Sequence, residues 1–132
     1  MKQQITKEDL AKLAHREQVA FAIFCAKQVY HLVEEKHKEA VDKCINITER
    51  WIVGEATSEE CGEVADATYT ATADAAYAAA NATYAAAYTA YAVYADAYAA
   101  SAAYNAAKNK AKTIEEQWEC YNALLNLENY LL

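Results

Sequence analysis

Tyrosines in an alanine-rich segment are the side chains best suited to recognising another molecule. Between residues 65 and 107 the sequence contains 23 alanines and eight tyrosines. The tyrosines are Tyr69, Tyr77, Tyr84, Tyr88, Tyr91, Tyr94, Tyr98 and Tyr104. A tyrosine offers a broad aromatic plane and a hydroxyl group, and it loses little side-chain entropy when it is fixed. The group therefore predicts binding chemistry.

The spacing of these tyrosines predicts that most of them share one side of a helix. Four recur every seven residues, and at about 100° per residue all but Tyr104 fall within an arc of about 120°. The opposite side is alanine, which lets another helix approach closely. The predicted surface comprises Tyr77, Tyr84, Tyr88, Tyr91, Tyr94, Tyr98, Asp66, Asp74 and Asn81. The alternative, that the rings form a core and only their hydroxyls reach the rim, stays open.

Charge is distributed unevenly along the chain. The formal net charge is −7, and residues 51–107 contain seven Asp/Glu and no Lys or Arg. A nucleic-acid binder needs clustered cations to displace condensed counterions. Direct nucleic-acid binding is therefore disfavoured. If a planar nucleotide stacked on the tyrosines, its phosphates would need cations from Arg50, Lys108 or Lys110, the nearest in the sequence.

The residue patterns that catalysis would need are missing. With two glycines and no proline, the chain has no glycine-rich loop to hold phosphates. No serine or cysteine lies in a nucleophile motif, and His15, His31 and His37 lack the spacing of a metal-binding pair. We predict that the protein is not an enzyme and has neither a cofactor nor a metal.

Cysteine spacing and hydropathy indicate the compartment. Cys25, Cys44, Cys61 and Cys120 are too far apart in the sequence for a close zinc or redox pair, so reduced and mostly buried thiols are expected. The N-terminus lacks the pattern of a secretory signal, and no run of about 18 residues is apolar enough to span a membrane. We predict a cytoplasmic protein with no membrane partner.

Helices must position these side chains. Apolar residues make up 55% of the 132 residues, which predicts one all-α domain over residues 1–132, a compact bundle of about five helices. The first helical stretch begins at Thr6, which forms a capping pair with Asp9. The second begins near His37 and stops at Gly54, a natural C-cap.

The alanine-rich region is expected to form the centre of the bundle. Thr57 and Glu60 form a capping box that starts this helical region. One helix over residues 58–108 would extend about 75 Å, too long for a domain of this size. We predict a break at residues 70–74 and a long helix from about residue 75.

A further capping box predicts the last helix. Thr113 can cap this helix while Glu116 reaches back to the backbone of Thr113. The buried side of the helix is expected to carry Ile114, Trp118, Tyr121 and Leu125.

Most of the chain resembles a known family. The carrying residues are the stretch Phe21–Glu34 with Cys25-Ala26, then Arg50-Trp51 and Gly54-Glu55, followed by the alanine-rich repeat. In these features residues 19–107 resemble the fifth immunity-protein type of bacterial polymorphic-toxin systems, which has relatives in phage genomes. The resemblance implies a non-enzymatic blocker of a harmful component. Members often carry histidine and arginine where this chain carries tyrosine, which predicts a different partner surface.

Two functions follow, from different classes. The first is a helical binding protein that neutralises a protein toxin or a defence protein by occupancy, with Arg50 and Trp51 added to the predicted surface. The second is a homo-oligomer that sequesters a nucleotide-like small molecule in tyrosine-lined pockets between subunits. A purely structural helical assembly is a third reading. The alanine side makes self-association an expectation in each case.

Overall fold

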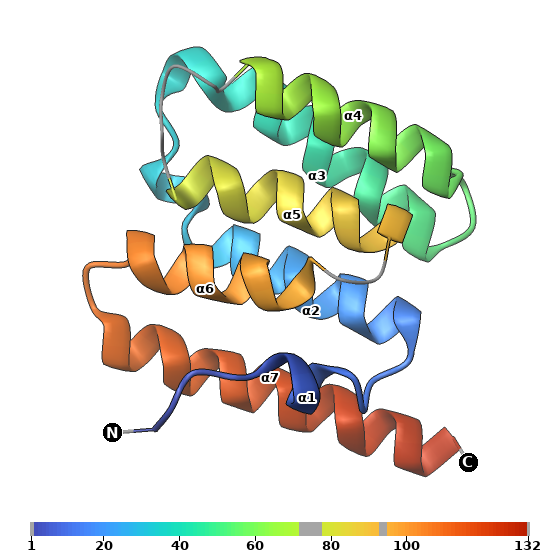
Figure 1. The fold of residues 1–132 in the computed structure, drawn as a ribbon, viewed down its shortest axis with the longest axis vertical. Helices are drawn as coiled ribbons and strands as arrows, with labels where there is room; N and C mark the ends of the chain where they lie inside the picture. Colours follow the sequence, from blue (N-terminus) through green and yellow to red (C-terminus); the bar gives the residue numbers. More distant parts are fainter. Residues whose placement is uncertain (1, 72–77, 93–94, 132) are drawn as a thin grey trace.

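The structure, a computed structural model, describes residues 2–71, 78–92 and 95–131. These ranges contain seven α-helices (Figure 1). They are α1 (Lys7–Leu10), α2 (His15–Gln28), α3 (Lys38–Ile52), α4 (Ser58–Ala71), α5 (Ala78–Ala92), α6 (Asp96–Ala106) and α7 (Lys110–Leu131). Short 3-10 turns at Tyr30–Leu32 and Glu35–His37 join α2 to α3. These ranges contain no strand, which confirms the all-α prediction, although the helices outnumber the five expected.

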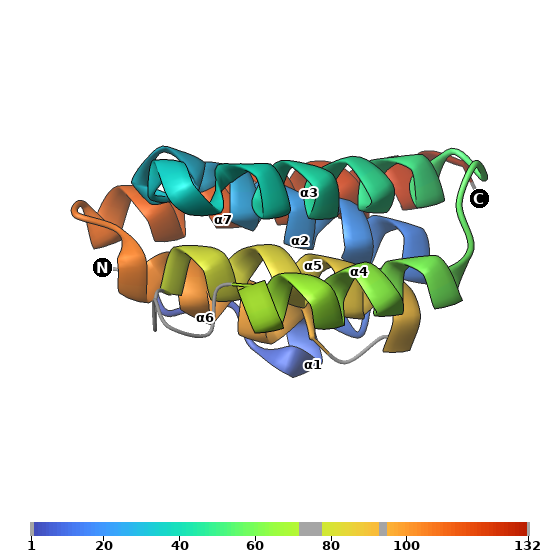
Figure 2. The same cartoon turned by 90° about the horizontal axis from the view of Figure 1, so that it is seen from above.

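The helices form two layers, visible from above in Figure 2. One layer contains α4, α5 and α6, and the other contains α2, α3 and α7. From α2 to α7, each helix runs antiparallel to the one before it. Helix α5 packs against α2, α3, α4 and α6, so the alanine-rich segment lies at the centre of the fold.

Local sequence signals set several helix ends. Thr6 and Asp9 form the predicted capping box, and Thr57 and Glu60 form another, in which each backbone N–H donates to the partner's side chain. Gly54 adopts a φ of 81° after α3, as expected of a C-terminal glycine.

The predicted start of the last helix was wrong. Helix α7 begins at Lys110, because Asn109 accepts the Lys112 N–H and caps the helix one turn earlier. The Thr113 hydroxyl donates to the Asn109 carbonyl within the helix. Glu116 accepts a hydrogen bond from Gln28 on α2 instead of closing a capping box.

The long helix predicted from about residue 75 was also wrong, because the chain reverses between α5 and α6. A continuous helix to residue 107 would be about 50 Å long, whereas α2, with 14 residues, would cover only about 21 Å of it. Folding back places the alanine sides of both helices on α2. The buried alanines include Ala82, Ala86 and Ala90 on α5, and Ala99 and Ala103 on α6.

The large buried apolar side chains come from several parts of the chain, and α2 supplies three of them, Val19, Phe21 and Ile23. Phe21, Val19 and Cys25 are inaccessible to solvent, and Leu10 from α1 packs in the same cluster. Ile114 and Tyr121 of α7 are buried as expected, while Trp118 and Leu125 are partly buried. Within the described residues, no helix has the length and apolarity needed to cross a membrane.

Candidate functional site

The tyrosines gather where three helices lie side by side. Tyr69 lies on α4, Tyr84, Tyr88 and Tyr91 on α5, and Tyr98 on α6; we call this set the tyrosine surface. The Tyr84 ring is central, with its centroid 5.3 Å from that of Tyr69, 5.9 Å from Tyr88 and 6.3 Å from Tyr98. Helix packing therefore brings together rings from three helices, whereas the sequence analysis placed the rings on α5 and α6 on one long helix.

Three of the five rings face solvent. Tyr69 is 55% exposed, Tyr91 53% and Tyr98 47%, while Tyr84 and Tyr88 are half-buried. Beneath them, α5 buries Ala85, Ala86 and other small side chains. Tyr69, Tyr91 and Tyr98 therefore do not form the core, whereas Tyr84 and Tyr88 pack partly against buried side chains.

Hydrogen bonds between side chains hold the half-buried rings in place. The Tyr88 hydroxyl donates to the Asp66 carboxylate on α4, and the Tyr84 and Tyr98 hydroxyls lie 3.4 Å apart. The bond to Asp66, with a smaller contribution from burial, raises the pKa of Tyr88 to about 12. Burial and the hydrogen bond to Tyr98 raise the pKa of Tyr84 as well. Both phenols are therefore neutral at physiological pH.

An acidic pocket of about 250 Å³ adjoins the tyrosine surface between α4 and α5. Its lining residues are Glu59, Gly62, Glu63, Asp66, Tyr88 and Tyr91. Gly62 makes the pocket possible, because a Cβ at this position would lie 2.8 Å from Tyr91 Cδ2. The Tyr91 ring thus rests directly on the α4 backbone, with carboxylates beside it.

Several predicted site residues lie elsewhere. Arg50 and Trp51 support the α3–α4 turn: Arg50 Nη2 donates to the Glu55 carbonyl at 3.2 Å, and Trp51 Nε1 donates to Ser58 Oγ at 3.0 Å. The Trp51 ring also packs on His15, with centroids 4.8 Å apart. Neither residue belongs to the tyrosine surface.

The other predicted positions divide into two groups. Asn81 is half-buried on α5, one turn before Tyr84. Tyr77, Asp74 and Tyr94 lie outside the described residues.

The sequence analysis missed the carboxylates that line the acidic pocket with Asp66. Glu59 and Glu63 lie one helical turn apart, and Asp66 follows after nearly another turn, so all three share one side of α4. The capping box at Thr57 and Glu60 set the start of this helix, so the shared side could have been found from spacing. Nothing in the sequence indicated that Gly62 lies at the site, because its contact is with the Tyr91 ring of α5, which is far from it in the sequence.

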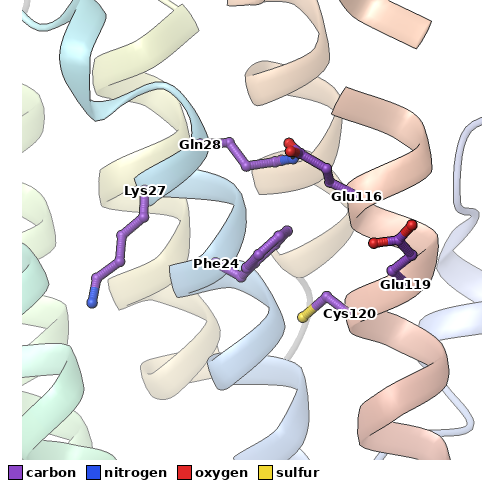
Figure 3. A pocket seen from close by; sticks show the side chains of 6 residues that line it. All are labelled: Phe24, Lys27, Gln28, Glu116, Glu119 and Cys120. Carbon is purple, nitrogen blue, oxygen red and sulfur yellow. The ribbon is translucent and has the colours of Figure 1, made fainter. Parts of the chain in front are cut away.

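A larger pocket, of about 570 Å³, lies between α2 and α7 (Figure 3). Phe24, Lys27, Gln28, Glu116, Glu119 and Cys120 line it. Gln28 Nε2 donates to Glu116 Oε1 at 3.1 Å and to the Thr113 carbonyl at 3.2 Å, so its polar groups join the two helices. Burial raises the pKa of the Cys120 thiol to about 11, which keeps it protonated. This pocket is better explained as a consequence of helix packing than as a reactive site.

The other cysteines are equally unsuited to nucleophilic chemistry. All four cysteines of the chain are free thiols. Burial raises the pKa of Cys44 and Cys61 to about 11, and it also raises the pKa of Cys25 well above its usual value. In the described part of the chain, no group of three His, Cys, Asp or Glu side chains is arranged to hold a metal ion.

Comparisons with known proteins add no family. A scan against models of protein families found no match, and searches of curated proteins and of solved structures found no significant match either.

Proposed function

We propose that this chain is a non-enzymatic binding protein that neutralises a protein toxin or a defence component by occupying it through the tyrosine surface. The observation that carries the proposal is the outward position of Tyr69, Tyr91 and Tyr98 on helices that bury alanine. Its class is that of bacterial immunity or phage counter-defence proteins, which the sequence resemblance implies.

The composition of the surface suits a protein partner. Tyrosine is among the side chains that contribute most binding energy at protein interfaces, because each ring gives large contact area at low entropic cost. Here the rings contact one another across α4, α5 and α6, so they are held in place before a partner arrives. Interfaces prepared in this way lose less entropy on binding.

The charge around the surface favours a basic partner over a nucleotide. Glu59, Glu63 and Asp66 lie beside the rings, whereas two of the three predicted phosphate-binding cations are engaged elsewhere. Arg50 pairs with Glu55, and the Lys110 ammonium group donates to three backbone carbonyls at the end of α6. An acidic surface accelerates association with a basic protein.

Site-specific photo-crosslinking in the producing cell tests this proposal. Benzoylphenylalanine at position 91 or 98 should capture the same protein, because both positions lie on the tyrosine surface. The same label at Glu115, exposed on α7, provides the control and should not capture that protein. The Tyr69→Ala/Tyr91→Ala/Tyr98→Ala variant should lose the partner while retaining its helical circular dichroism spectrum.

Two results would contradict the proposal. Capture that is equal at positions 91, 98 and 115 would remove the tyrosine surface from consideration. A nucleotide retained in native mass spectrometry, on a closed homo-oligomer, would instead establish the sequestration function. The same spectrum reports the mass of the assembly, and hence whether the expected self-association occurs.

A further inference from the structure

The acidic pocket between α4 and α5 combines two features that suit a cation. One wall carries the rings of Tyr88 and Tyr91, and the other carries Glu59, Glu63 and Asp66. Aromatic faces attract cations through their quadrupole, and carboxylates attract them through charge and hydrogen bonds. A pocket that presents both is typical of recognition of an ammonium or guanidinium group.

The aromatic wall is held in position by the backbone of α4. Gly62 has no side chain, so Tyr91 Cδ2 and Cγ lie 2.8 and 3.0 Å from where a Cβ would be. The ring is nevertheless 53% exposed. Tyr88 is fixed by its bond to Asp66. Two rings are therefore in place before any ligand binds.

The carboxylates of the pocket are not neutralised by the chain itself. Among the described residues, the ion pairs join Lys27 to Glu49, Lys36 to Glu34, Lys38 to Glu35 and Arg50 to Glu55. None of them uses a pocket carboxylate. Residues 51–107, which include the whole pocket, contain no Lys or Arg.

We infer that this pocket receives an arginine side chain from the partner, with the guanidinium plane on Tyr91 and its N–H groups directed at Glu59 and Asp66. Arginine fits better than lysine because its planar fork can stack on a ring and donate to carboxylates at the same time. The inference rests on the proposed function, since the partner supplies the arginine. It adds the chemistry that a basic partner must present.

A peptide titration followed by NMR tests the inference without knowledge of the partner. The probe is a blocked Gly-Gly-Arg-Gly-Gly peptide, and its counterpart contains citrulline, which has nearly the same shape and no charge. The arginine peptide should bind saturably with a Kd of about 1–10 mM, a range suited to one side chain. It should shift the signals of Gly62, Asp66 and Tyr91, and the citrulline peptide should bind at least about tenfold more weakly.

A matched pair of variants locates the binding. Glu59→Gln/Asp66→Asn should weaken the arginine peptide about tenfold, because it removes two charges and leaves hydrogen-bond acceptors. Glu63 is left intact, since it also borders the groove that contains Lys36 and Lys43. Glu8→Gln/Glu115→Gln removes the same charge from α1 and α7 and should leave the affinity unchanged.

Three outcomes would overturn the inference: equal affinity for the citrulline peptide, tighter binding of a lysine peptide, or the same affinity in both double variants. They are separable from failure of the proposed function. Crosslinking at positions 91 and 98 without any preference for arginine rejects the pocket assignment alone. Arginine binding at the pocket without a crosslinked protein rejects the neutralising function.

Discussion

Helices α2 and α5 pack against each other at the centre of the molecule, yet they bury opposite kinds of side chain. Helix α2 turns Val19, Phe21 and Ile23 inward. Helix α5 turns Ala82, Ala86 and Ala90 inward and leaves Tyr91 exposed. Helix α2 therefore places its large side chains in the core, whereas α5 places a large side chain, Tyr91, at the surface.

The buried side chains of α2 and α5 stabilise the fold, whereas the exposed tyrosines remain accessible to other molecules. Each large apolar group that α2 buries contributes substantial hydrophobic free energy, because this term grows with the apolar area removed from water. Alanine on α5 contributes less per residue, but it allows α2, α3, α4 and α6 to approach closely. The exposed tyrosines Tyr69, Tyr91 and Tyr98 can then be replaced at little cost to folding.

The largest difference in the free energy of unfolding should appear when one large side chain is truncated in the core and one on the tyrosine surface. Phe21→Ala should lower the free energy of unfolding by about 3–5 kcal/mol, because it leaves a cavity in the core. Tyr98→Ala should change it by about 0.5 kcal/mol or less, as for other exposed positions. Urea denaturation of both variants measures the difference. Similar losses would show that Tyr98 is part of the core.

Enlarging a buried alanine should break the close packing of α5. Ala86→Leu should cost about 1–3 kcal/mol, because the extra atoms have no space between α5 and its neighbours. Ala123→Leu, at an exposed position on α7, is the matched control and should be close to neutral. Thermal unfolding measures the stability of both variants. An Ala86→Leu variant as stable as the native protein would contradict the tight packing of alanine on α5.

The contact between Gly62 and Tyr91 should appear as coupling between two substitutions. In a Tyr91→Ala background, Gly62→Ala should stabilise the protein by about 0.5–1 kcal/mol, because alanine favours a helix interior. In the native background this gain should disappear, since the new Cβ displaces the ring. A double-mutant cycle measures the coupling. Equal gains in both backgrounds would mean that the ring does not rest on Gly62.

The smallest effect concerns the ionisation of Tyr88. Its pKa is raised from 10.0 to about 12, mainly by the bond to Asp66. The neutral phenol is therefore favoured in the folded state, so its stabilising contribution is complete below pH 10 and is lost as the pH rises toward 12. Asp66→Ala should return one tyrosine to ordinary ionisation in an alkaline absorbance titration. An unchanged titration curve would rule out the bond.

The sequence allowed the fold class and several helix ends to be predicted, because those signals are local. The Thr57–Glu60 capping box and Gly54 act through neighbouring backbone groups and needed no tertiary information. The reversal between α5 and α6 could not be predicted in this way. No glycine or proline in the sequence between α5 and α6 marks a helix end there. The antiparallel arrangement of the two helices is favoured because it covers the alanines of both with α2.

The candidate site was only partly accessible to prediction for the same reason. Helical spacing grouped the tyrosines as candidates, but it placed Tyr84, Tyr88, Tyr91 and Tyr98 on one long helix. The contact of Tyr84 with both Tyr69 and Tyr98 requires three separate helices. Arg50 and Trp51 were assigned to the site, whereas their hydrogen bonds serve the α3–α4 turn. Their roles depended on partners that spacing alone does not identify.

The inward alanines of α5 also affect how such a protein can diversify. Ala82, Ala86 and Ala90 set the distances between the helices and are shielded from anything that binds outside. Side chains at positions 69, 91 and 98 can therefore be exchanged while the scaffold keeps its shape. Libraries that vary these three positions should yield folded proteins with new targets, much as antibody loops vary on a constant framework.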